Sequence, residues 1–566
     1  SANALTISGT FTRLYVTARG VALPTFGAPA TGALAESLEQ HRAFFDRDQT
    51  PPASHLFTTA AVDAPRATVA FAEIDGGKDR FVFTYDSLED RSETLDALVP
   101  AQGVGDREFR RMLFRVSLSK QPINRSVKEP VPPRFMLVDL DFTLTASDAK
   151  DASLVVTETI VPQGAGQRSF RFGLWKTIYF EDGKSPRQMM VKSVVDAAGR
   201  AIPFDHDRDQ ILVVLPEPAP AGKPFKLTFR IDGDFLIRPG GDNYWELGIG
   251  AWYPEPPLSA QAFSLHAVVK VKGPFIPLVP GKTIRREKEG EYNVVETRVE
   301  QPIMSPAILA GKFSFEEQTR NGVTIRVATY AMKNTRAMKQ LAELAFGMIQ
   351  YYEYFLGPFP FPEFNIIQVN SYGWGQAPPG TMFITNEAFQ PTLGFENQYF
   401  SEGINERFAH EIAHQYWGYV VKMPSYEEQW LDEAFAEYSA ALVLKKFQGQ
   451  AVYDRMVNRW RANAQIARKV APIPYANRIS WTRDGHAAFM HRIYLIYDKG
   501  AYLLATLHKE LGDETFLTFM KSYQKSFRWK HGSTKHVAGL LQFMTKKDYS
   551  EFFDKNFWGT EMPASK

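Results

Sequence analysis

The 566-residue sequence contains no cysteine. Disulfide bonds, thiolate-ligated metal ions and thiol nucleophiles are therefore excluded, and His, Asp and Glu are left as the metal ligands. A chain without thiols also suits an oxidising compartment. Together with the first residues, "SANA", which read as a processed or engineered start, this favours an extracytoplasmic location, periplasmic or secreted after removal of a signal peptide. A cytoplasmic location is the alternative.

An excess of charge of one sign is missing as well. The 65 basic residues face 63 acidic ones, so the net charge is only +2 and no overall field attracts a polyanion. Nucleic acid is therefore not expected as a partner. No run approaches the roughly 18 apolar residues that a membrane-spanning helix needs, so no membrane-spanning segment is expected in this chain. The oligomeric state has no signature in the sequence.

The composition is that of an ordinary globular protein, with 44% hydrophobic and 23% charged residues. A chain of this length is too long for one hydrophobic core, so several domains are expected. Strand-like runs such as "FVFTYDSL" and "LFRVSLS" dominate the first 120 residues, and one helix is predicted over residues 33–47. The proline-rich segment 121–134 then disfavours regular structure and indicates a domain boundary.

Alternation of apolar and polar residues becomes regular from Phe135 onward. The run "VDLDFTLT" places Val138, Leu140, Phe142 and Leu144 on one face of a strand, and similar runs predict an antiparallel sandwich to about residue 318. Helical spacing begins with "NTRAMKQLAELAFGMIQYYEYFLG" and continues thereafter. Strands followed by helices indicate the α+β class. We predict a β-rich module over residues 1–130, a β-sandwich domain over 131–320 and a mainly helical domain over 321–566.

The segment "RFAHEIAHQYWG" places His410 and His414 four positions apart, with Glu411 directly after the first. Four residues advance a helix by about 40° beyond a full turn, so both imidazoles project from one face and can bind one ion. Glu411 lies roughly 100° from His410 around the helix and reaches a water on that ion instead. This pattern arises by chance in roughly one such chain in a hundred. The motif alone does not exclude the alternative to a metal site, in which the two histidines lie at the edge of the core and the glutamate lies on the surface.

A third ligand is available in "EEQWLDEAFAEYSAALVL", which is predicted to be a second amphipathic helix. Glu433 follows His414 after eighteen intervening residues and faces the same ion if the two helices pack antiparallel. Three protein ligands leave a coordination position open, which is typical of catalytic zinc. Glu437 lies one turn further on and is either a hydrogen-bond acceptor for a metal-bound histidine or a surface residue.

These residues resemble the aminopeptidase N family of gluzincin zinc metallopeptidases. The similarity covers about residues 135–560 and leaves residues 1–130 outside. It implies a thermolysin-like catalytic domain with one zinc ion as cofactor, in which His410, His414 and Glu433 bind the zinc and Glu411 is the general base. Tyr497 in "YDKG" matches the family tyrosine that donates to the oxyanion.

Three departures from the family pattern bear on the function. Asp432 stands where the family usually has Asn, in a position beside the ligands. The chain also stops where the family's helical C-terminal domain would begin, so either the cleft is open on that side or the chain is a fragment. Finally, the family motif Gly-x-Met-Glu-Asn, whose glutamate binds the free amino group of the substrate, is replaced by "GWGQAPPGTMFITNEAF".

Anchoring that comparison on "IT" places Pro379 where the family glutamate should be. The run "TMFIT" is expected to survive as the edge strand that pairs with an extended peptide. The residues predicted to line the substrate site are Gln376, Pro379, Gly380 and Met382, with Glu246 and Glu387 as substitutes for the amine-binding glutamate.

The leading hypothesis is therefore a zinc-dependent peptidase that removes N-terminal residues from peptides. One alternative is an endopeptidase or blocked-peptide hydrolase without a free-amine requirement, as the lost motif suggests. The other is a zinc-bearing binding protein with vestigial activity, against which the intact Glu411 argues.

Overall fold

The computed structural model describes the N-terminal region over residues 13–19, 53–63, 69–75, 80–86, 93–100 and 110–118. From residue 133 it describes the chain to residue 563, apart from residues 149, 179–186, 208, 240, 332, 372–374, 390–401 and 479–485. The helix predicted over residues 33–47 lies outside the described residues. Among the described helices, none combines the length and the apolar character needed to cross a membrane.

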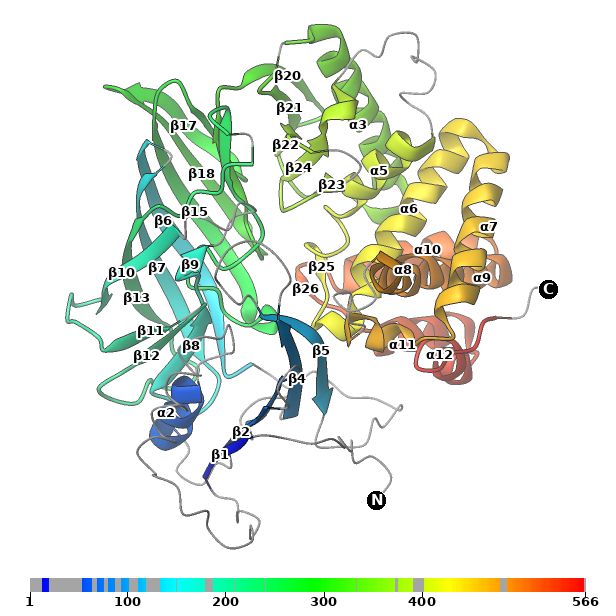
Figure 1. The fold of residues 1–566 in the computed structure, drawn as a ribbon. Coiled ribbons are helices and arrows are strands. Elements are labelled where there is room, and N and C mark those ends of the chain that lie inside the picture. Colours follow the sequence, from blue (N-terminus) through cyan, green and yellow to red (C-terminus); the bar gives the residue numbers. More distant parts are fainter. Residues whose placement is uncertain are drawn as a thin grey trace, which may run out of the picture.

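The N-terminal region contains an antiparallel sheet whose strands follow one another in sequence order. These strands are β1 (Arg13–Arg19), β2 (Val69–Asp75), β3 (Arg80–Asp86), β4 (Glu93–Pro100) and β5 (Arg110–Leu118). Helix α2 (Ala53–Asp63) precedes β2 and ends on Asp63, whose carboxylate accepts hydrogen bonds from the backbone N–H groups of Arg168 and Ser169 and pairs with Arg134. The helix is thereby attached to the neighbouring sandwich (Figure 1).

The sandwich is built around an eight-stranded sheet in the order β17-β18-β15-β6-β7-β13-β10-β9. Its strands are β6 (Phe135–Asp148), β7 (Asp151–Pro162), β9 (Thr177–Ile178), β10 (Arg187–Asp196), β13 (Phe225–Gly233), β15 (Gln261–Lys272), β17 (Lys282–Glu289) and β18 (Tyr292–Ile303). Two three-stranded sheets accompany it: β11 (Phe204–Asp207), β12 (Gln210–Val214) and β8 (Ser169–Gly173), and β14 (Tyr244–Leu247), β19 (Ile308–Gly311) and β16 (Ile276–Leu278).

Two details of this sheet differ from the predictions. Strands β6 and β15 pair in parallel, so the sandwich is not wholly antiparallel. More than a hundred residues separate these strands, and no tight hairpin fixes their relative direction. In β6 the register shifts between Leu137 and Asp139, which buries Leu137 and leaves Val138 37% exposed. A β-bulge of this kind reverses the alternation, so the prediction that Val138 shares the buried face of Leu140 was wrong.

The sheet of the C-terminal half has the order β20-β21-β22-β24-β23. Its strands are β20 (Ser314–Arg320), β21 (Val323–Thr329), β22 (Glu363–Val369), β23 (Gly375–Gln376) and β24 (Thr381–Thr385). Strands β21, β22 and β24 run parallel, whereas β23 turns back and pairs antiparallel with β24. The run "TMFIT" is therefore an internal strand, and the prediction that it forms the edge was wrong. The edge next to the helices is β23.

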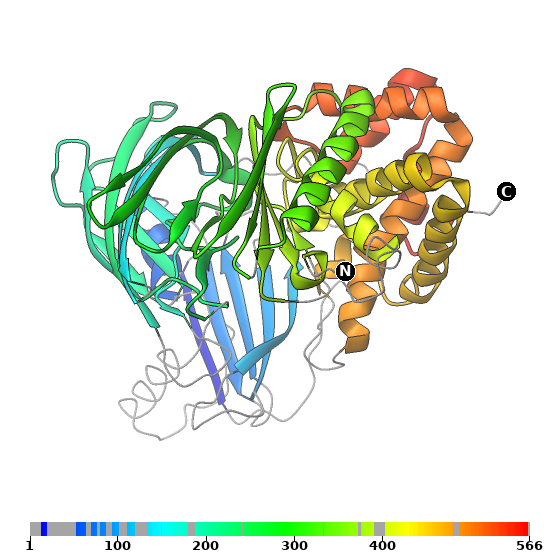
Figure 2. The same ribbon diagram turned by 90° about the horizontal axis from the view of Figure 1, so that it is seen from above.

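Helices cover this sheet and extend beyond it, as Figure 2 shows. They are α3 (Thr335–Leu356), α5 (Glu402–Ala413), α6 (Trp430–Gln448), α7 (Gln450–Ala467), α8 (His486–Ile493), the π-helix η5 (Tyr494–Lys499), α9 (Gly500–Leu511), α10 (Asp513–Ser526), α11 (Thr534–Thr545) and α12 (Ser550–Asn556). The short strands β25 (Val421–Lys422) and β26 (Lys530–His531) pair in parallel with each other.

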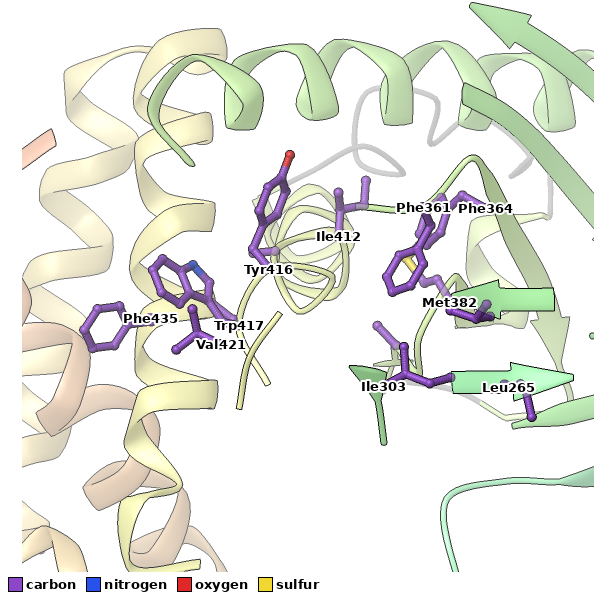
Figure 3. Close-up of a cluster of buried hydrophobic side chains, with 14 of the residues drawn as sticks. Leu265, Ile303, Phe361, Phe364, Met382, Ile412, Tyr416, Trp417, Val421 and Phe435 are labelled. Carbon is purple, nitrogen blue, oxygen red and sulfur yellow. The ribbon is translucent and has the colours of Figure 1, made fainter. Parts of the chain in front are cut away.

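One hydrophobic core joins the sandwich to the helices. In Figure 3, Leu265 and Ile303 of the sandwich lie near Met382 of the sheet of the C-terminal half, and Ile412 of α5 and Phe435 of α6 continue the same cluster. The core thus does not break at the predicted domain limit near residue 320, and the limit itself remains a prediction. The packing fixes α5 and α6 relative to the sandwich.

An acidic side chain interrupts the core of the sandwich. Glu158 of β7 is fully buried, and within the described chain neither of its carboxylate oxygens has a hydrogen-bond partner. Burial raises its pKa well above the ordinary value of 4.5. Glu255, which like Glu158 lies close to Tyr253, is also acidic and cannot compensate a negative charge. The Glu158 carboxyl group is therefore neutral in the folded protein.

We expect Glu158→Gln to stabilise the protein in a pH-dependent way. The unfolded chain ionises above pH 4.5 while the folded carboxyl stays neutral, so wild-type stability falls by about 1.4 kcal/mol per pH unit until the raised folded pKa is reached. The amide has no such loss. The melting temperature of the variant should exceed that of wild type at pH 8, by about 1 °C per kcal/mol for a chain of this length, and match it near pH 4.5. Glu300→Gln, at a position 67% exposed, is the control. A difference that is constant across pH would contradict the assignment.

Candidate metal centre

Helix α5 presents the two histidines on one face. Its apolar residues Phe408 and Ile412 are fully buried and set the rotation of the helix. The assigned helix ends at Ala413, but the N–H group of His414 still donates to the carbonyl oxygen of His410 at 3.2 Å, so helical geometry extends to His414. The two imidazole rings lie 4.6 Å apart, and their Nε2 atoms are 3.0 Å apart.

Glu433 completes the group from the first turn of α6. Its Oε2 lies 3.4 Å from Nε2 of His410 and 3.3 Å from Nε2 of His414. The ligand atoms of these three residues all lie within 4.8 Å of one another, which is close enough to hold one metal ion. The structure thus brings together the three residues that the spacing singled out.

Two further carboxylates lie behind the histidines. Nδ1 of His410 lies 3.1 Å from Oε2 of Glu437, and Nδ1 of His414 lies 2.7 Å from Oδ1 of Asp432. Carboxylates accept hydrogen bonds, so each Nδ1 carries the proton and each Nε2 presents a lone pair to the centre. Oε2 of Glu433 is buried and, within the described chain, has no hydrogen-bond partner. Three electron-pair donors that converge in a buried place fit a divalent cation, and the histidine and carboxylate donors fit zinc.

Glu411 lies beside this group and is 5% exposed. Burial raises the pKa of its carboxyl group, and the two histidines act in the opposite direction. Gly375 of β23 packs directly on it: a Cβ atom at this position would lie 2.4 Å from Oε1 of Glu411. A larger residue at this position would displace the carboxylate of Glu411.

Tyr497 approaches from the π-helix η5. Its ring stacks on that of His410, with a centroid distance of 5.7 Å and an interplanar angle of 14°. Burial raises the pKa of its hydroxyl group well above 10, and so does the negative charge of Glu433. Tyr497 is therefore a neutral hydrogen-bond donor next to the three ligands. π-Helical turns are frequent at functional sites because they change the direction of a side chain.

The structure places the residues predicted to line the substrate site in different surroundings. Gln376 is half-buried on β23, at the sheet edge. Met382 is fully buried in the hydrophobic core, so its predicted contact with substrate was wrong. Pro379 and Gly380 lie in the buried turn between β23 and β24, where the N–H group of Gly380 donates to Oε1 of Gln415 at 2.8 Å. These two residues shape the edge strand and do not face a cleft. Glu387 belongs to a short 3-10 helix (Asn386–Ala388) that follows β24.

Glu246 lies where the sandwich meets the catalytic sheet. It shares β14 with Tyr244, two residues away and on the same face of the strand. The hydroxyl oxygen of Tyr244 accepts a hydrogen bond from the backbone N–H group of Asn370, directly after β22. Glu246 thus faces the same end of this sheet as Asn370, where β22 ends and the chain continues to β23. Burial raises its pKa to about 7.

Sequence reasoning missed the roles of Gly375 and Gln415. The Nε2 group of Gln415 lies 3.3 Å from the carbonyl oxygens of Ala377, Pro378 and Thr381, so this side chain holds the turn before β24. Gln415 was visible beside His414 in the motif, but its partners are distant in sequence. Gly375 had a weak signal in "GWGQAPPG", where glycines are dense.

Comparison with known proteins agrees with this geometry. Residues 340–557 match the model of the peptidase family M1 domain. The fold is similar to that of the M1 zinc metallopeptidase from Deinococcus radiodurans, with a TM-score of 0.61 at 17% identity over 78% of this chain and 99% of that one. The alanine/arginine aminopeptidase of Saccharomyces cerevisiae is 26% identical over 54% of this chain and 35% of its own length. Aminopeptidase M1-C of Oryza sativa subsp. japonica is 26% identical over 43% of this chain and 28% of its own.

Residues 340–557 are thus similar to the peptidase family M1 domain, and the predicted resemblance to the aminopeptidase N family is confirmed. The predicted α+β architecture, with β-rich parts ahead of a helical domain, is confirmed as well. The predicted class, zinc metallopeptidases, and zinc as cofactor agree with the same matches and with the three converging ligands. The chain spans about a third of the length of the curated relatives it matches.

We expect zinc affinity to fall steeply as the pH falls. Burial lowers the pKa of His410, but the carboxylate of Glu433 close to Nε2 and that of Glu437, which accepts from Nδ1, raise it to about 9. A proton therefore competes with the metal ion for Nε2 below pH 9. For each proton that zinc must displace, its affinity falls by about tenfold when the pH is lowered by one unit. Competition with a zinc-binding dye at pH 6, 7 and 8 measures this dependence. An affinity that is constant over this range would contradict it.

Proposed function

We propose that this protein is a zinc-dependent peptidase that removes N-terminal residues from peptides. The observation that carries the proposal is the convergence of His410, His414 and Glu433 beside a buried Glu411. A structural zinc site uses all its coordination positions for protein ligands, whereas three ligands next to a carboxylate suit hydrolysis. The names of the relatives, which are aminopeptidases, support the same conclusion.

The side chains divide the chemistry among them. Zinc, when bound, lowers the pKa of a coordinated water and polarises the carbonyl group of the scissile bond. Glu411 accepts the proton of the attacking water and then delivers it to the leaving amine; its buried position suits a base of raised pKa. Tyr497 donates its hydroxyl hydrogen to the oxyanion that forms at the carbonyl oxygen. Glu437 and Asp432 orient the two imidazoles.

The edge strand β23 provides the place for an extended peptide. Its outer edge is the side that does not pair with β24, and main-chain hydrogen bonds of an added strand would lie beside Glu411. No acidic residue occurs between Gly375 and Thr385 to bind the substrate's amino group. Glu246, which faces this end of the sheet, is our proposed amine-binding residue. A second candidate function, hydrolysis of blocked peptides, is favoured by the same lack of an acid on β23.

Glu411→Gln should abolish turnover without loss of metal. The amide matches the carboxylate in shape but accepts no proton, so we expect kcat to fall by at least about a hundredfold. Hydrolysis of aminoacyl anilides and zinc content per chain are the measurements. Glu427→Gln, half-buried ahead of α6, is the matched control and should leave both unchanged. Full activity of Glu411→Gln with bound zinc would rule out the mechanism.

Glu246→Gln should discriminate between free and blocked peptides. Loss of its carboxylate removes a charged partner for the substrate's amino group, so KM for a free peptide should rise by about tenfold or more. The N-acetylated form of the same peptide serves as the internal control and should be a poor substrate for both enzymes. Mass spectrometry of the products identifies the bond that is cleaved. Equal cleavage of free and acetylated peptides by wild type would instead support the blocked-peptide function.

A further inference from the structure

A buried cluster of carboxyl groups lies behind His410, on the side away from the other ligands. Glu406 comes from α5, Glu437 from α6 and Asp498 from the π-helix η5, and their side chains are largely or almost fully buried. Arg459 of α7 enters this cluster. Its guanidinium group contacts Glu437 at 3.1 Å and Glu406 at 3.0 Å, with a second contact to the latter that makes the pair bidentate.

Both oxygens of Glu437 are used in this arrangement. Oε2 lies 3.1 Å from Nδ1 of His410, and Oε1 accepts from the indole N–H group of Trp460 at 2.9 Å and from Arg459. Rotation of the carboxylate would break at least one of these bonds. Arg459 and Trp460 of α7 therefore set the orientation of the His410 ring through Glu437.

Arg459 also joins two helices that carry the site. Glu406 precedes His410 by one turn on α5, while Glu437 follows Glu433 by one turn on α6. Without the guanidinium group between them, these two acids would face each other at close range in a water-poor place and repel. The bidentate geometry suits arginine and is not reproduced by lysine, whose single ammonium group has no planar fork.

We propose that Arg459 is a positioning residue for the metal site: by bridging Glu406 and Glu437 it fixes His410 and slows the release of the metal ion. This inference rests on the proposed zinc peptidase. It differs from a role in folding, because α7 is anchored by its buried residues Val452, Met456 and Trp460, whereas the side chain of Arg459 is 45% exposed. Removal of the guanidinium group thus leaves the core packing intact.

The test measures the rate at which zinc leaves the full-length holoenzyme in the presence of excess chelator. Loss of an outer partner of a metal-bound histidine weakens metal binding by about 10–100-fold, so Arg459→Ala should release zinc about tenfold faster or more. Arg459→Lys should release zinc at a rate between those of Arg459→Ala and wild type. Arg461→Ala, an exposed arginine two residues further along α7, is the matched control and should release zinc at the wild-type rate.

A second variant and a spectroscopic signal separate this role from misfolding. Glu406→Gln removes the same bridge from its other end, and it should also accelerate release. The visible absorption of the cobalt-substituted protein should change in Arg459→Ala and Glu406→Gln but not in Arg461→Ala. Release from folded Arg459→Ala at the wild-type rate would overturn the inference alone. A wild-type protein that binds no zinc would overturn the proposed function and this inference with it.

Discussion

The packing of α5 against α6 is the contact on which the metal site depends. α5 carries both histidines and Glu411, while α6 carries Glu433 and the acceptors behind the histidines. α6 is buried on nearly all sides between Trp430 and Leu444, so it cannot rotate or slide without disturbing the core on several faces. The carboxylates are therefore held at fixed distances from the imidazoles before any ligand arrives, and little ordering remains for the moment of binding.

The sandwich takes part in this rigidity. The fully buried Lys422 of β25 donates to the carbonyl oxygens of Pro302, in the sandwich, and Trp529. The Tyr244 hydroxyl accepts from the backbone N–H group of Asn370. Together with the continuous core of Figure 3, these bonds hold the sandwich rigidly against the C-terminal half. A peptide on β23 would lie against a surface to which both parts of the chain contribute.

The ligands could be predicted from sequence because their geometry is mostly local. An i, i+4 pair of histidines must share a helix face. The eighteen residues between His414 and Glu433 are enough for the chain to turn back and place Glu433 on a second helix packed against the first. Features set by distant pairing could not be read in the same way: the bulge that exposes Val138, the parallel pairing of β6 with β15, and the approach of Arg459 to Glu437. The run "TMFIT" did carry a signal, since an unbroken apolar stretch is typical of a strand covered on both faces.

The π-helix η5 uses three consecutive residues for three different neighbours. Tyr497 faces the metal ligands, Asp498 accepts from Asn463 behind them at 3.0 Å, and Lys499 donates to the carbonyl oxygen of Gly559 near the end of the described chain at 3.1 Å. One residue more or less in this turn would rotate all three contacts by about 100°. A change in the length of this turn would therefore disturb the metal ligands, the carboxyl cluster behind them and the contact with Gly559 together.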